Sequence, residues 1–157
     1  MSDLRRRESK SDREPVGEPV REPVLTTVPR ALKVWFVIHF VLDVAFAVPL
    51  LVVPESFLHL LGWRSVDPFS ARLIAAAFLG IGIESLLGRH ASPDAFKALL
   101  NLKIIWSMAA VIGMGITLVQ ASQSWPWGGW GLLAIFGGFN AVWIYWRVQI
   151  SSAGRQE

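Results

Sequence analysis

The chain has 157 residues, of which 53% are hydrophobic and 17% are charged. A soluble domain usually carries about 25% charged residues, so the composition favours a membrane protein over a soluble enzyme. The absence of cysteine excludes disulfides, thiol redox chemistry and cysteine-ligated metal sites. The net charge is +3. Because Lys and Arg flank apolar segments, membrane topology explains this charge better than nucleic-acid binding, and we expect no nucleic-acid partner.

The segment 1–30 is rich in charges and proline. It contains Glu-Pro-Val three times, at residues 14–16, 18–20 and 22–24. Each proline fixes φ and removes a backbone donor, so a helix cannot propagate. We expect a disordered cytoplasmic tail. The alternative is a partner-binding or lipid-binding arm, although the acidic residues of the tail nearly cancel its basic ones, which disfavours electrostatic lipid binding.

Four apolar segments follow the tail, and about 20 apolar residues give ~30 Å of helix, the thickness of the hydrocarbon core. The expected spans are residues 31–53, 69–88, 95–119 and 130–147, within a domain of residues 31–150 and before a short tail at 151–157. Proline at residue 54 and glycine at residue 62 indicate a short interfacial helix after the first span. The predicted fold is all-α, an up-down-up-down four-helix transmembrane bundle.

The distribution of Lys and Arg predicts the orientation. One side of the bundle receives Arg30, Lys33, Arg89, Lys97, Arg147 and Arg155, and the other receives Arg64 and Arg72. Cytoplasmic loops are enriched in Lys and Arg. We therefore expect a multi-pass protein of the inner or plasma membrane with both termini in the cytoplasm, its immediate partner being the lipid bilayer.

Five polar side chains fall inside the predicted spans: His39, Asp43, Glu84, Lys103 and Asn140. An ionisable group at mid-bilayer costs about 2.5–3.5 kcal/mol by insertion scales, so these groups should face the bundle interior. All five lie ~6–18 Å from the predicted cytoplasmic ends of their helices. We predict one buried polar cluster, in which Glu84 pairs with Lys103. Asp43 would orient His39, one helical turn away, and Asn140 would supply amide hydrogen bonds.

This cluster has two interpretations that the sequence leaves open. Buried polar groups can lock helix register, and intramembrane ionisable groups often mark functional sites. Catalytic residues stay unassigned, because Ser85 follows Glu84 but points about 100° away around the helix. No cofactor or metal is predicted: His39 is the single histidine inside the spans, and the lysine beside it would repel a metal ion.

Several segments resemble small prokaryotic four-helix membrane proteins of the DoxX-like superfamily. They are residues 54–58, 61–63, 67–68, 71–73, 80–89, 100–107 and 139–147. The resemblance covers the membrane core and implies the four-helix layout. Some DoxX-like proteins are linked to quinone-coupled redox chemistry, but no cofactor ligand carries over to this sequence.

Three functions remain as hypotheses. The first is an accessory or small-ligand-binding bundle taking a small lipophilic ligand. In this hypothesis the small-residue stripe of Ala76, Gly80 and Gly88 would join copies of the chain into a homo-oligomer. The second is an oxidoreductase subunit that handles a quinone or another lipid-soluble substrate. The third is a proton-coupled carrier with His39 and Asp43 as its proton site.

Overall fold

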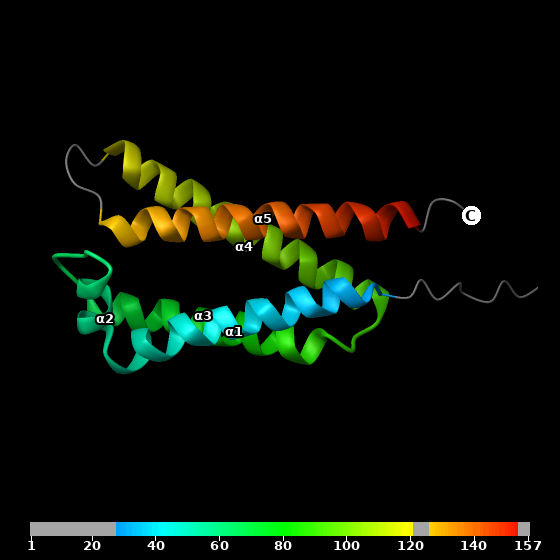
Figure 1. Cartoon of the computed structure of the whole chain (residues 1–157), viewed down its shortest axis with the longest axis horizontal. Coiled ribbons are helices and arrows are strands. Elements are labelled where there is room, and N and C mark those ends of the chain that lie inside the picture. The colour runs from blue at the N-terminus through cyan, green and yellow to red at the C-terminus, as the bar shows by residue number, and fades with distance from the viewer. Residues whose placement is uncertain (1–27, 121–125, 154–157) are drawn as a thin grey trace, which may run out of the picture.

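The computed structural model describes residues 28–120 and 126–153, and this part of the chain is helical without any strand. Its helices are α1 (Arg30–Val52), α2 (Pro54–Leu60), α3 (Pro68–Gly88), α4 (Pro93–Gln120) and α5 (Trp127–Ala153) (Figure 1). Four of them, α1, α3, α4 and α5, are long and apolar enough to cross a membrane. Most of the predicted N-terminal tail lies outside the described residues.

Local chemistry explains where α3 begins. The Asp67 carboxylate accepts hydrogen bonds from the backbone N–H groups of Phe69 and Ser70, at 3.1 and 3.2 Å, and from the Ser70 hydroxyl. Asp67 is therefore an N-cap, and Pro68 occupies the first helical position, where its missing N–H costs nothing. The Ser70 hydroxyl and these backbone N–H groups lower the pKa of Asp67.

The short helix α2 is followed by a turn that contains a glycine. Gly62 has φ +95°, a left-handed conformation that side chains disfavour, and it turns the chain back so that Trp63 N donates to Leu58 O at 3.0 Å. The first residues of α5 pack on this turn. Gly128 N donates to Leu61 O at 2.9 Å, and a Cβ on Gly128 would lie 2.7 Å from Leu61 Cβ.

The last helix extends beyond Arg147, where the sequence predicted its end. It continues to Ala153, so the first residues of the expected C-terminal tail are helical. Arg147 does not interrupt the helix, since arginine is a good helix former. Its Nε donates to Asn101 Oδ1 on α4 at 2.8 Å, and the same guanidinium donates to Ser151. One turn further, Ile150 is buried and holds the extension against the bundle.

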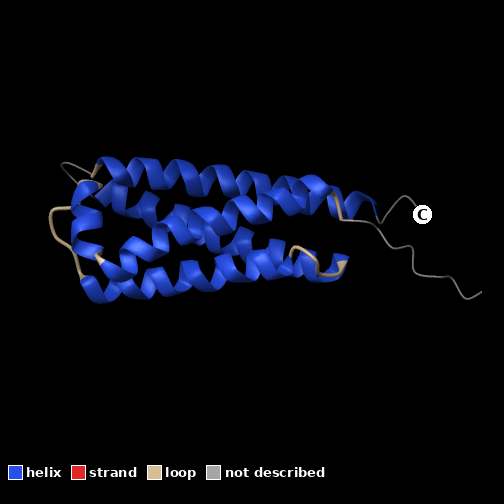
Figure 2. Ribbon diagram, turned by 60° about the horizontal axis from the view of Figure 1, so that its bottom comes forward, coloured by secondary structure: helices blue, strands red, loops and turns tan. Residues whose placement is uncertain are grey.

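The four long helices run along one common direction (Figure 1 and Figure 2) and pack chiefly as two pairs, α1 with α3 and α4 with α5. One core cluster, at the end where α1 begins, joins the pairs through Leu32, Phe36, Phe96, Leu100, Trp143 and Ile150. A second core cluster, toward the α2 end, consists of Ala47, Leu50, Ala71, Ala75 and Phe78. Toward its C-terminal end α4 diverges from α3 (Figure 1).

Candidate functional site

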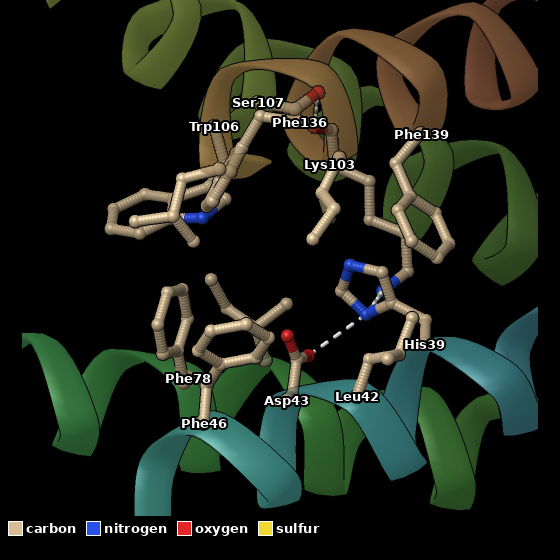
Figure 3. A pocket seen from close by; sticks show the side chains of 13 residues that line it. His39, Leu42, Asp43, Phe46, Phe78, Lys103, Trp106, Ser107, Phe136 and Phe139 are labelled. Atoms are coloured by element: carbon tan, nitrogen blue, oxygen red, sulfur yellow. Dashed lines mark hydrogen bonds and ion pairs between the residues drawn. The ribbon is translucent and has the colours of Figure 1, made fainter. Parts of the chain in front are cut away.

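Between the two core clusters lies a group of polar side chains, and its first members are one turn apart on α1. His39 Nδ1 lies 2.8 Å from Asp43 Oδ2 (Figure 3). Within the described part of the chain, this buried oxygen has no well-aligned hydrogen-bond donor, so the close contact with His39 is an ion-pair approach. The α3 backbone comes close to Asp43 because residue 82 is glycine: a Cβ there would lie 2.8 Å from Asp43 Cβ.

Lys103 on α4 reaches the same point from the other helix pair. Its Nζ donates to Ser85 Oγ at 2.5 Å and lies 3.3 Å from His39 Nδ1. The ammonium also lies 5.0 Å from the ring centre of Phe36 and 5.2 Å from that of Trp143, within the range of cation–π attraction. Only 3% of Lys103 is exposed. A serine, two aromatic rings and an imidazole thus surround a buried cation.

The position of His39 Nδ1 gives this group two alternative proton arrangements. One ring nitrogen cannot donate to Asp43 and accept from Lys103 at the same time. If Nδ1 carries the proton, it faces the Asp43 carboxylate and Nε2 is an acceptor. If Nδ1 accepts from Lys103, Nε2 carries the proton and becomes a donor. Among the described residues Nε2 has no hydrogen-bond partner, and it points toward a cavity (Figure 3).

Asn140 and Ser107 form a second polar unit, between α4 and α5. Asn140 Nδ2 donates to Ser107 Oγ at 2.9 Å and to Ile104 O at 3.1 Å, and the Ser107 hydroxyl donates to Lys103 O at 2.6 Å. The predicted amide hydrogen bonds of Asn140 are therefore present. They join the two helices of one pair and do not reach His39.

The predicted pairing of Glu84 with Lys103 is wrong. Glu84 is exposed on the outer surface of α3 and makes no hydrogen bond or ion pair with any described residue, while its neighbour Ser85 is fully buried and contacts Lys103. The buried face of α3 passes through Ala71, Ala75, Phe78, Gly82 and Ser85. Residue 84 lies about 100° from residue 85 around the helix and must face outward. Ser85 is identified by its place on this buried face, which the structure reveals.

The polar group opens onto a cavity between α1, α3, α4 and α5. Its walls are His39, Leu42, Asp43, Phe46, Phe78, Ile81, Lys103, Trp106, Ser107, Leu132, Ile135, Phe136 and Phe139 (Figure 3). One Asp43 oxygen faces His39 and the other faces the cavity (Figure 3). The cavity volume of about 40 Å³ holds about three water molecules. It is therefore a small polar chamber with mostly apolar walls.

Over residues 28–120 and 126–153, no three His, Asp or Glu side chains come together in a way that could hold a metal ion. The chain was compared with protein families, with curated proteins and with solved structures, and none of the three comparisons gave a match.

Proposed function

We propose that this protein is a multi-pass plasma-membrane protein whose buried polar site binds a small ligand. In this proposal the four long helices cross the bilayer up-down-up-down, both termini are cytoplasmic and α2 lies at the outer interface. The apolar lengths of the helices and the distribution of Lys and Arg support this topology. The proposed role is that of a binding or accessory protein.

The unused hydrogen-bonding capacity at the cavity carries the proposal. A polar lock should satisfy its own groups, since unpaired polar atoms in an apolar interior are costly. The amide nitrogen of Asn140 meets that description, with both of its hydrogen bonds made inside the bundle. By contrast, His39 Nε2 and one Asp43 oxygen point into an open space without partners among the described residues (Figure 3). Such free groups suit a ligand better than a lock.

Binding can be tested by thermal unfolding of the purified protein with decanol, decanoate, decylamine and decylubiquinone as probes. A bound probe at 100 times its Kd stabilises the folded state by about 2.7 kcal/mol, so at least one should raise Tm by several degrees. His39→Phe and Asp43→Asn should abolish or alter that shift. Glu84→Gln is the control for loss of a carboxylate outside the cavity, because Glu84 is exposed and does not line it. A lock is the correct description if no probe shifts Tm, or if all variants respond like the native chain.

A proton-coupled carrier is a second candidate, favoured by the contact of His39 Nδ1 with both Asp43 and Lys103. A proton gained or lost here would change whether Nε2 donates or accepts, and so would couple protonation to ligand binding. In proteoliposomes with a pH gradient, Asp43→Asn should then abolish gradient-driven uptake of whichever probe binds. Uptake that continues at the native rate in this variant would eliminate the carrier mechanism.

A further inference from the structure

A wide apolar groove adjoins the polar cavity. It lies between α3 and the diverging half of α4, with α5 behind it, and residues lining it include Ile74, Phe78, Trp106, Gly113, Thr117 and Phe136. Its volume is about 600 Å³, within the range of about 300–1,000 Å³ typical of ligand pockets. Phe78, Trp106, Leu132 and Phe136 line both spaces. The groove and the polar cavity are therefore adjacent.

The sizes of the two spaces indicate that a ligand filling both has a small part and a large part. The polar cavity, at about 40 Å³, admits a head group of a few atoms and nothing larger. The groove is large enough for the body of a ligand, but its walls are almost wholly apolar. A molecule that fills both spaces must have a small polar head and an apolar chain.

The opposite end of the polar cavity is closed. Phe36, Phe96 and Trp143 are all fully buried there, and Phe36 and Trp143 lie against the Lys103 ammonium. Phe36 also packs against the other two rings, with centres 4.9 Å from Phe96 and 5.7 Å from Trp143. This end therefore offers no route to His39 and Asp43, whereas the groove adjoins the cavity on the side of the bundle that carries α2.

The charges of the site select the head group. Among the side chains that line the cavity, the Asp43 carboxylate and the Lys103 ammonium balance when the imidazole is neutral, so an ionised head would add an unpaired charge beside apolar walls. The free Asp43 oxygen is an acceptor, and His39 Nε2 is a donor or an acceptor according to its proton. A hydroxyl is the smallest neutral group that donates and accepts, and it matches both arrangements.

We infer that the ligand is a neutral single-chain amphiphile whose hydroxyl head lies between Asp43 and His39 and whose chain lies in the groove, entering sideways from the bilayer. This inference rests on the proposed ligand-binding function and specifies the class of ligand and its route.

The test is photo-crosslinking in phosphatidylcholine nanodiscs, using hexadecanol with a mid-chain diazirine and the corresponding hexadecanoic acid. The alcohol should label groove-lining residues of α4, and excess unmodified hexadecanol should compete. Gly113→Leu and Gly115→Leu form a matched pair, because a Cβ at either position meets nothing within 4 Å, but Gly113 alone lines the groove. We expect Gly113→Leu to lower labelling about fivefold or more, and Gly115→Leu to leave it unchanged.

The head group is tested separately with Asp43→Asn, which leaves the positive charge of Lys103 without the balancing charge of Asp43. This variant should shift the ratio of alcohol to acid labelling toward the acid by about fivefold or more. If both glycine variants are labelled equally while the ratio of alcohol to acid labelling still changes in Asp43→Asn, the chain does not lie in the groove. The proposed ligand site would remain supported. An unchanged ratio, with Gly113→Leu still blocking labelling, means that chains enter the groove without reaching the polar site. That result overturns both the head assignment and the proposed function.

Discussion

Two glycines of α3, Gly80 and Gly82, provide a direct test of how this helix faces the bundle. A Cβ on Gly82 would lie 2.8 Å from Asp43 Cβ and 3.2 Å from Asp43 Oδ2, whereas a Cβ on Gly80 meets nothing within 4 Å. Gly82→Ala should therefore push α1 and α3 apart, and Gly80→Ala should change no contact. The two substitutions differ in nothing but the face of the helix on which they lie.

The expected magnitude follows from this pairing. Both variants gain the same helix propensity, at most about 1 kcal/mol, so it cancels in their difference. Carbon atoms pack best at about 3.5–4.0 Å, so relief of the Gly82→Ala contact needs a shift of roughly 0.7 Å between the helices. Overpacking of this kind costs about 1–3 kcal/mol. Gly82→Ala should be less stable than Gly80→Ala by that amount.

The measurement is the free energy of unfolding in mixed micelles, followed by far-UV circular dichroism as SDS is added. A difference below about 0.5 kcal/mol would contradict the close approach of α3 to Asp43. A larger loss in Gly80→Ala would contradict it more strongly, because it would mean that the stripe of Ala76, Gly80 and Glu84 packs against another surface.

Two further predictions concern the polar contacts. Asn140→Leu should lower the free energy of unfolding by about 0.6–1.7 kcal/mol, as found for hydrogen bonds between membrane helices. A double-mutant cycle with Ser107→Ala should show positive coupling. Additive changes in the free energy of unfolding would exclude the hydrogen bond. The pKa of Asp67 is lower in the folded state than its ordinary value of 3.8, so its stabilisation is complete above the ordinary value and is lost as pH falls through the folded one. Acid titration of Tm should show this loss in the native chain and not in Asp67→Asn, and parallel curves would contradict it.

The sequence was sufficient for the helices and for most of the polar cluster. Length and apolarity located the membrane-length segments. The common depth of His39, Asp43 and Lys103 placed them at one level, and they do meet there. Rise per residue is a property of the helix alone, so depth can be estimated without knowledge of the neighbouring helices.

The direction in which α3 faces could not be obtained in the same way. Lipid is as apolar as a protein core, so a helix that is apolar all round has no amphipathic face to indicate its orientation. Two small-residue stripes competed on α3, one through Gly80 and Glu84 and one through Gly82 and Ser85. The contact of Gly82 with Asp43 and the hydrogen bond from Lys103 to Ser85 distinguish them, and these contacts depend on α1 and α4. The partner of Arg147 likewise comes from another helix, because Asn101 lies on α4.

The division of the bundle into two helix pairs has a consequence for biosynthesis. Each pair is continuous in sequence, so α1 and α3 can associate while the later helices are still being made. Lys103 contacts Ser85 and His39, and both of these belong to the early pair. Lys103 itself belongs to the late pair. Until the pairs dock, this cation lacks Ser85 and His39, and Trp143 of α5 is its cation–π partner within the late pair. Its cost there favours docking, so the polar site forms as the last step of assembly and also helps to drive it.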